Sequence, residues 1–293
     1  MPLALLFVAL ALMALGGTGL LRNVNYHRGM WDHTLSRTAE ADTCQGVDVL
    51  FIGSSHAYRT FDPRILASRG LRMFNLGSSN QSPLQTRMLL QLYLDAMAPR
   101  LLVVEVHPDM VENDGVEAAV HLGNNMRPSL PMARMVVATC NAKAVLSMCY
   151  SAFRNSVDPL PQDAVDEENV YVDGGYVEYR SGTYRPEPHA PHTIDFRREQ
   201  LDALRDCVEM ARRRGIACLL VEVPGTQALM DSYSNHDEFA ARMQALGDYR
   251  FLRPEGLCDT LHFYDDDHLN QQGVELYLPL LCDSVIIPKI SAL

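Results

Sequence analysis

Two short stretches near opposite ends of the chain carry the residues best suited to chemistry. In the first, Val49–His56, an apolar run ends at Gly-Ser-Ser-His. The second, Asp265–His268, reads Asp-Asp-Asp-His. A serine hydroxyl is a weak nucleophile until a base takes its proton, and an Asp-x-x-His segment can supply that base together with a carboxylate that orients it. If the fold brings the two stretches together, they predict acyl transfer through a serine.

Each residue would have a separate task in that chemistry. Ser55 would attack an acyl carbon, His268 would take and return the proton, and Asp265 would hold the imidazole in the required tautomer. Each stretch by itself also allows a plainer interpretation. Gly-Ser-Ser after a strand is often an ordinary turn. The acidic run could be solvated carboxylates, a helix cap at Asp267 or Asn270, or a poorly spaced site for a divalent cation.

Alternating strands and helices surround the first stretch. Two helices are predicted to begin with a capping side chain and a proline, at Asp62-Pro63 and Ser82-Pro83, and to end at Gly70 and Pro99. The strand segments are mainly apolar, which is typical of parallel strands buried on both faces. Ligands bind outside the carboxyl ends of such strands, where Ser55 would lie. The predicted strands are Val47–Ile52, Leu71–Leu76, Leu101–Val106, Ile216–Val223 and a short one at Phe251-Leu252.

The middle of the chain is less regular. Residues 107–192 are predicted to be an insertion on the rim of the sheet, in the position of a lid or substrate cover. It would contain one helix at Met132–Arg154 and a hairpin of Asn169–Val172 and Tyr176–Arg180. Regular helices follow: one capped by Thr193 and ended by Gly215, then His236–Leu246 and about Gln271–Val285.

The chain begins with a separate apolar segment. Residues 2–21 carry no charge and match the roughly 20 apolar residues that span a bilayer. We expect an uncleaved membrane anchor, with a cleaved signal peptide as the alternative, followed by a polar connector over residues 22–46. Arg22 and Arg28 would keep the next domain on the cytoplasmic side by the positive-inside rule, but two arginines carry little weight.

Composition limits the classes of function. Of the 293 residues 47% are hydrophobic, enough for a core that needs no disulfide or metal. A formal net charge of −11 disfavours nucleic acid as a partner, because phosphate binding depends on clustered Lys and Arg. The seven cysteines form no C-x-x-C pair, so neither a zinc site nor a redox dithiol is expected.

With these blocks in this order, the chain resembles the SGNH (GDSL-like) hydrolases from about Val47 to Val285. The family has Gly-Asp-Ser after its first strand, where this chain has Gly53-Ser54-Ser55, and Asp-x-x-His near its C-terminus, matched by Asp265 to His268. The resemblance implies a flavodoxin-like three-layer α/β/α fold with a central parallel sheet. It also implies an acyl-enzyme on Ser55 that needs no metal or organic cofactor.

The other family blocks concern the oxyanion hole. Gly77 follows the second strand and corresponds to a family glycine whose backbone N–H is a donor. The third block, Gly-x-Asn-Asp, is missing, and its place is taken by Glu105–Asp109. The resemblance therefore assigns oxyanion donation to Ser55 and Gly77, with Asn80 or His107 replacing the absent asparagine. The side chains expected to line the pocket are Ser54, His56 and His107.

The resemblance implies serine-dependent hydrolysis or transfer of an acyl ester. The family's membrane-anchored, cell-envelope members suggest an acylated carbohydrate as substrate and a domain on the outer, periplasmic or extracellular, side. The alternative is a non-catalytic envelope protein that uses the same fold to bind a polysaccharide or a partner. The missing asparagine block favours that alternative, whereas the intact serine and Asp-x-x-His argue against it.

Overall fold

The centre of the protein is a parallel β-sheet. The computed structural model describes residues 29–157, 163, 167–180 and 184–293. Its five-stranded sheet has the order β2-β1-β3-β6-β7, with every pair parallel. Counted along the chain, this is the 2-1-3-4-5 order of flavodoxin-like folds, so the predicted α/β fold with a central parallel sheet is confirmed. The strands are β1 (Val49–Ile52), β2 (Met73–Asn75), β3 (Leu101–Glu105), β6 (Ala217–Glu222) and β7 (Asp248–Phe251).

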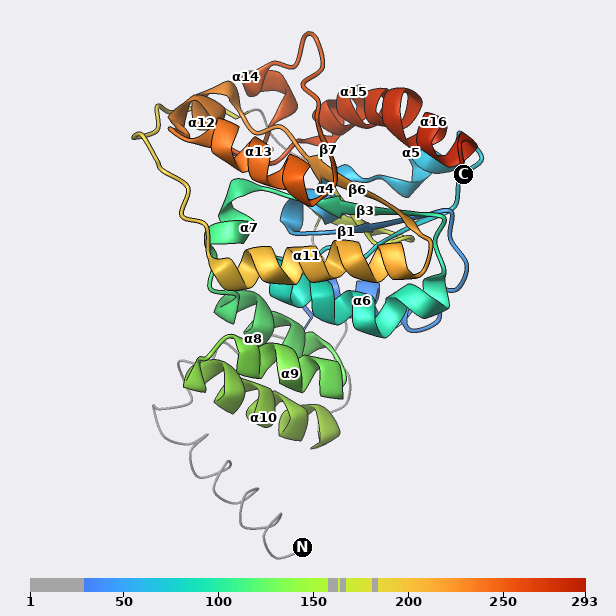
Figure 1. Ribbon diagram of the computed structural model, residues 1–293, viewed down its shortest axis with the longest axis vertical. Coiled ribbons are helices and arrows are strands. Elements are labelled where there is room, and N and C mark those ends of the chain that lie inside the picture. Colours follow the sequence, from blue (N-terminus) through green and yellow to red (C-terminus); the bar gives the residue numbers. More distant parts are fainter. Residues whose placement is uncertain (1–28, 158–162, 164–166, 181–183) are drawn as a thin grey trace, which may run out of the picture.

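Helices cover both faces of this sheet (Figure 1). Leu50 and Ile52 of β1 pack on the side of α6 (Pro83–Met97) and α11 (Arg198–Arg213), whereas Val49 and Phe51 pack on the side of α15 (Gln271–Leu281). Because both of their faces are buried, the central strands β1 and β3 show no polar alternation, whereas the edge strand β7 reads Asp-Tyr-Arg-Phe. The other helices around the sheet are α4 (Ser55–Thr60), α5 (Pro63–Ala67), α12 (Gln227–Ser232), α13 (His236–Leu246), α14 (Asp259–His262) and α16 (Ile287–Ser291), the last joined to α15 by a π-helical turn, Cys282–Ile286.

The helix starts predicted at Asp62-Pro63, Ser82-Pro83, His236 and Gln271 are confirmed, and the one at Thr193 is wrong. Asp62 caps α5, and Ser82 forms a capping box with Gln85 at the start of α6. The helix expected from Thr193 begins at Arg198 instead. The segment before it is held outside the helix, because the backbone N–H of Ile194 donates to the side chain of Asn235, 2.8 Å away.

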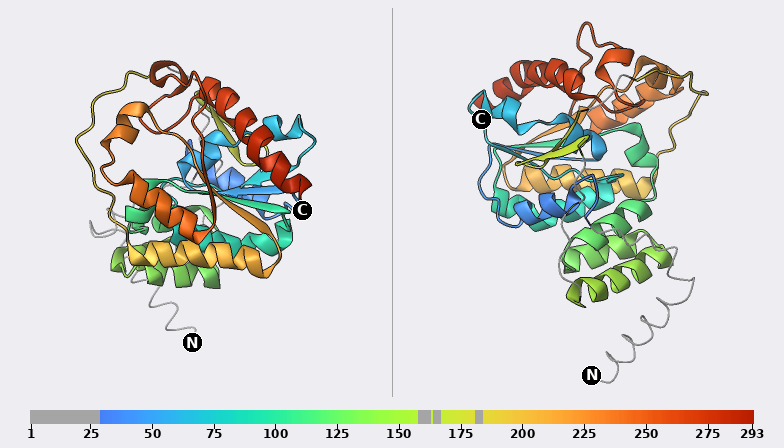
Figure 2. Two further views of the ribbon diagram at one scale, coloured as in Figure 1. Left: turned by 45° about the horizontal axis from the view of Figure 1, so that its top comes forward. Right: turned by 180° about the vertical axis from the view of Figure 1, so that it is seen from behind.

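The inserted region forms a bundle of short helices and a hairpin. The bundle lies beside α6, away from α15 (Figure 1). The single helix predicted at Met132–Arg154 is two helices, because Cys140 adopts a left-handed φ of 51° and the side chain of Asn141 then accepts the N–H of Lys143. The hairpin is confirmed and packs against α4 (Figure 2). These elements are α7 (Pro108–Glu112), α8 (Val116–Asn125), α9 (Leu130–Ala138), α10 (Ala142–Val157), β4 (Asn169–Val172) and β5 (Tyr176–Tyr179).

The region expected to be a connector contains a packed helix. Helix α3 (Thr34–Ala41) buries Arg37, whose guanidinium donates to the carbonyls of Gly175 and Asp32 at 2.9 Å. The described part of residues 22–46 therefore belongs to the folded domain. The proposed anchor at residues 2–21 lies outside the described residues, and within the described ones no helix has the length and apolarity to cross a membrane.

Candidate active site

The turn after β1 places Ser55 at the edge of the sheet. Ser55 is the first residue of α4, and the Ser54 side chain caps that helix by accepting the N–H of His56. The backbone N–H groups at the start of a helix have no intrahelical acceptor, so that of Ser55 is available to a ligand. A Cβ at Gly53 would overlap the side chain of Glu105, which explains the glycine at this tight passage.

The late segment brings an imidazole to this serine. Nε2 of His268 lies 2.7 Å from Oγ of Ser55. On the other side of the ring, Nδ1 lies 2.9 Å from Oδ2 of Asp265. The Asp265 carboxylate also accepts the backbone N–H of His268 at 2.7 Å, which fixes the turn between them. The structure thus unites the three residues predicted to act together, in the spacing of a Ser-His-Asp triad.

A second carboxylate, which was assigned no catalytic role from the sequence, shares the same imidazole. Oδ1 of Asp267 lies 2.7 Å from Nδ1 of His268, and its side chain is 26% exposed against 41% for Asp265. Burial opposes a charge on His268, but Asp267 and Asp265 outweigh it and raise the pKa of His268 to about 10. Burial opposes a charge on Asp267, but the positive charges of His268 and His56 outweigh it and hold the pKa of Asp267 well below its usual range. The only feature of the sequence that could have indicated this second carboxylate is the run of three consecutive aspartates before His268.

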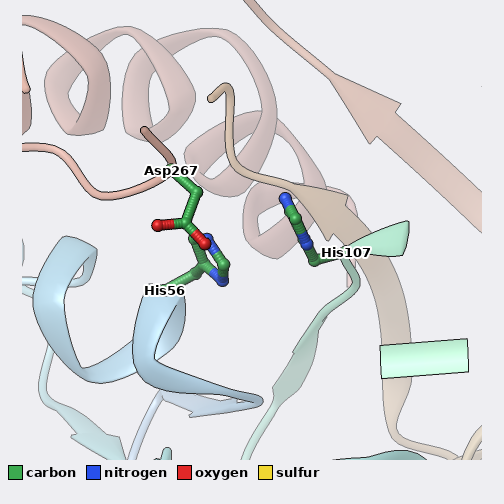
Figure 3. Close-up of side chains that lie close together, drawn as sticks. All are labelled: His56, His107 and Asp267. Atoms are coloured by element: carbon green, nitrogen blue, oxygen red, sulfur yellow. The ribbon is translucent and has the colours of Figure 1, made fainter. Parts of the chain in front are cut away.

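The predicted pocket side chains lie behind the triad rather than in the cavity. The His56 ring stacks between those of His107 and His268, with centroids 4.3 and 4.6 Å apart. Nδ1 of His56 contacts Oγ of Ser54 at 2.8 Å, and that hydroxyl donates to Oε2 of Glu105. Figure 3 shows the Asp267 carboxylate beside the His56 ring and His107 farther along. The feature of the sequence that could have indicated this buried network is Glu105, a charged residue at the end of an otherwise apolar strand.

Two groups of side chains around His268 lie close enough together to share a metal ion. His56, His107 and Asp267 bring one possible ligand atom each to within 4.8 Å of one another, as do Asp265, Asp267 and His268. The rings of His56 and His107 are stacked at an interplanar angle of 19°. Because a nitrogen lone pair lies in the plane of its ring, stacked rings do not direct their lone pairs at one point. The second set already serves the imidazole of the triad, so neither cluster fits a metal well.

A cavity of about 1020 Å³ opens in front of Ser55. Ser55, His268 and Asp265 share its wall with residues of α8 and the hairpin, so the predicted insertion does border the candidate site. The lining is mainly polar and aromatic. Its polar members include Asp32, Arg59, Asp114, Glu117, His121 and Lys143; its aromatic members are Trp31, Tyr58, Tyr179 and Tyr264; its aliphatic members are Met30, Val116 and Val120.

Two buried charges in this lining were missed by the sequence analysis. Oδ2 of Asp32 lies 2.7 Å from Nε2 of His121 and accepts the hydroxyls of Thr34 and Ser79 at 2.8 and 3.0 Å. Arg59 lies within 5.7 Å of four aromatic ring centroids and donates to the Asn169 side chain at 2.8 Å. Most groups that contact Asp32 and Arg59 come from other elements of the fold, so no spacing in the sequence relates them.

The two predicted oxyanion donors besides Ser55 differ in placement. Asn80 lines the cavity in a left-handed conformation, with a φ of 52°. Gly77 does not line it, and its N–H donates to Oδ1 of Asn75 at 2.9 Å. A Cβ at Gly77 would lie 2.9 Å from both the Ser54 carbonyl oxygen and the Tyr58 nitrogen. Its lack of a side chain therefore serves the packing of this loop on α4.

The fold has solved counterparts at low similarity. The chain is similar to a GDSL-like lipase of Bacteroides thetaiotaomicron VPI-5482, at 12% identity and a TM-score of 0.44, over 89% of this chain and 98% of that one. It is also similar to a Bacteroides fragilis NCTC 9343 protein provisionally described as an acylhydrolase, at 12% identity and a TM-score of 0.42, over 87% and 95%. No model of a protein family and no curated protein matches the sequence. These values are too low to assign an activity to this chain.

Proposed function

We propose that the protein is a serine-dependent hydrolase of acyl esters. The observation that carries this proposal is the continuous contact from Oγ of Ser55 through His268 to Asp265, at 2.7 and 2.9 Å. Ser55 attacks the ester carbonyl while Nε2 of His268 takes its proton. The same proton then goes to the departing alcohol, which leaves an acyl-enzyme on Ser55. Water, activated by His268, attacks that ester and releases the acid.

The negative oxygen of each tetrahedral intermediate needs donors close to Ser55. The backbone N–H of Ser55 is one candidate, because it begins α4 and has no intrahelical acceptor. The Asn80 side chain is the other, since it lines the same cavity. A missing donor typically costs about 10²–10³ in turnover. We therefore assign to Asn80 the part played by the asparagine of the family's absent third block.

The cavity wall supports a polar leaving group. Three aliphatic residues, Met30, Val116 and Val120, line it, among many charged and aromatic ones. Sugar hydroxyls can hydrogen-bond to such charged groups and a sugar ring can stack on Trp or Tyr, whereas a long acyl chain would need a continuous apolar wall. We propose an O-acylated carbohydrate of the cell envelope as the substrate, with a small acyl group. Transfer to a sugar hydroxyl instead of water would use the same acyl-enzyme.

We also propose that the chain is held at a membrane by residues 2–21, with its domain on the outer side. The described chain starts at Gly29, whose N–H donates to the side chain of Asn125 at the end of α8. Residues 118–157 contain no Asp or Glu, although the chain has 36. They carry the exposed cations Arg127, Arg134 and Lys143. A positive region close to the start of the domain suits an anionic lipid surface.

Reaction with a fluorophosphonate probe tests the proposed chemistry, because only an activated serine is labelled. Labelling is expected for the wild type, to vanish in Ser55→Ala and to fall strongly in His268→Ala. Ser68→Ala, an exposed serine after α5, is the matched control and should label normally. If folded wild-type protein does not label, the non-catalytic binding protein is the better interpretation.

A further inference from the structure

A second pair of polar side chains lies directly behind the triad. The Asp267 carboxylate contacts two imidazoles at once: Oδ1 is 2.7 Å from Nδ1 of His268, and Oδ2 is 3.3 Å from Nε2 of His56. The two rings stack with centroids 4.6 Å apart and an interplanar angle of 13°. Neither Asp267 nor His56 is among the residues that line the cavity, so contact with a substrate explains neither of them.

Contacts on the far side of His56 indicate its protonation state. The Ser54 hydroxyl donates its hydrogen to Oε2 of Glu105 at 2.9 Å. Its oxygen can therefore only accept a hydrogen bond from Nδ1–H of His56, 2.8 Å away. A neutral ring protonated on Nδ1 would turn the lone pair of Nε2 toward the Asp267 carboxylate, which is repulsive. A proton on Nε2 removes that repulsion, although the 3.3 Å contact lacks the alignment of a hydrogen bond. His56 is then a buried imidazolium between two carboxylates.

We propose that His56 and Asp267 are positioning residues that set the pH range in which His268 acts as a base. Asp267 shares the Nδ1 proton of His268 with Asp265, and the positive charge on His56 offsets the negative charge that this second carboxylate brings. The positive charge on His56 opposes the rise in the pKa of His268 that the two carboxylates cause. His268 therefore loses its proton, and can accept that of Ser55, at a lower pH than it would beside an uncharged residue 56. The catalytic part of this inference rests on the proposed ester chemistry.

The ionisable groups around the two rings all enter this balance. His56 faces Glu105 from the end of β3, His107 and Asp109 from the start of α7, and Asp267 and His268 from the loop before α15. His268 also faces Asp265 and the Tyr264 ring. Burial holds the pKa of His107 well below its ordinary value, so it adds no charge. Burial lowers the pKa of His56, but the Asp267 carboxylate outweighs this and raises it.

Substitutions on the two sides of the His56–Asp267 contact should act on His268 in opposite directions. Asp267→Asn removes a carboxylate that stabilises the protonated ring, so the pKa of His268 falls and activity extends to lower pH. His56→Gln removes a positive charge that disfavours the protonated ring, so the pKa of His268 rises and activity moves to higher pH. A charge at this separation shifts a pKa by about one unit or more.

The experiment measures the pH dependence of kcat/KM and, by NMR, the titration of the His268 ring in the full chain. Asp266→Asn is the matched control, because it makes the same change one residue away and the Asp266 carboxylate contacts Tyr184 and His189 instead. The expected result is a shift to lower pH for Asp267→Asn, to higher pH for His56→Gln, and none for Asp266→Asn. Shifts in the same direction, or lost activity with an unmoved pH dependence, would overturn the proposal.

The NMR titration separates this inference from the proposed function, because it needs no turnover. If the ring titrations diverge as expected but no ester is cleaved and no probe reacts, His56 and Asp267 do control the pKa of His268 and the hydrolase proposal fails. If esters are cleaved and the titrations do not diverge, the inference fails and the hydrolase stands. Circular dichroism checks the fold of each variant. Should His56→Gln not fold, the titration of Asp267→Asn against Asp266→Asn decides.

Discussion

The cavity has two kinds of wall, and they differ in how their polar groups are held. At the sheet edge, Ser55 and His268 are fixed by helix α4, by hydrogen bonds and by buried neighbours. On the inserted helices, Glu117 and Lys143 line the cavity as exposed side chains. Groups held in place suit bond breaking, whereas exposed ones can adapt to a substrate. If the proposed function holds, this difference predicts that bond breaking and substrate choice depend on separate parts of the chain.

Removing the base should give the largest effect at the sheet edge. His268→Gln leaves Ser55 without a proton acceptor, so kcat/KM for a small ester is expected to fall about 10⁴-fold. Steady-state kinetics with a chromogenic acetate ester measure this. His262→Gln, in the short helix α14 outside the cavity lining, is the matched control and should stay close to wild type. Comparable losses in both variants would mean that the sheet edge holds no special base.

Removing the proposed oxyanion donor should give a smaller effect on the same wall. Asn80→Ala is expected to lower kcat by about 10²–10³ with little change in KM, because the donor acts mainly on the transition state. Asn80→Gly separates the side chain from its left-handed backbone, since glycine adopts that conformation freely. If both variants keep wild-type kcat, the second donor lies elsewhere.

A change in the inserted wall should instead affect large substrates. Val120→Trp on α8 puts a bulky ring into the cavity lining, so KM for acylated oligosaccharides is expected to rise about tenfold while a small acetate ester is cleaved normally. Val137→Trp is the matched control, because Val137 is 64% exposed on α9 and does not line the cavity. Equal effects on small and large esters would contradict the division between the two walls.

The smallest expected effect concerns the outer surface of the inserted helices. Reversing two charges with Arg127→Glu and Arg134→Glu should reduce binding of the full chain to vesicles containing phosphatidylglycerol severalfold, and leave binding to neutral phosphatidylcholine vesicles unchanged. Arg198→Glu with Arg205→Glu on α11 makes the same charge change elsewhere and serves as control. Flotation measures the bound fraction. If both pairs behave alike, this surface has no particular affinity for anionic lipid.

The sequence predicted the sheet more successfully than the insertion, for a physical reason. Strands such as Val49–Ile52 and Leu101–Glu105 are buried on both faces and read as unbroken apolar runs between caps and glycines. In the insertion, the break at Cys140 depends on one residue in a left-handed conformation, which no hydrophobic pattern shows. Helix α3 was missed because its polar residues, such as Arg37, are buried through hydrogen bonds rather than apolar packing.

The candidate site divides in the same way. Ser55, Asp265 and His268 could be found because two local patterns name them, and each pattern has its own spacing. The part of Asp267 could not be found, since adjacent aspartates look alike until the backbone turns one of them toward His56. The position of Gly77 was recognised, but its N–H pairs with Asn75 through a turn whose shape the sequence does not specify.

The distance along the chain between Ser55 and His268 has a consequence for how the protein is made. The two residues are 213 positions apart, so the imidazole is synthesised well after the serine. Under the proposed chemistry, the hydroxyl of Ser55 is an ordinary alcohol until the segment with His268 has been made and has packed beside it. The return of probe labelling after denaturation would then report the docking of that segment.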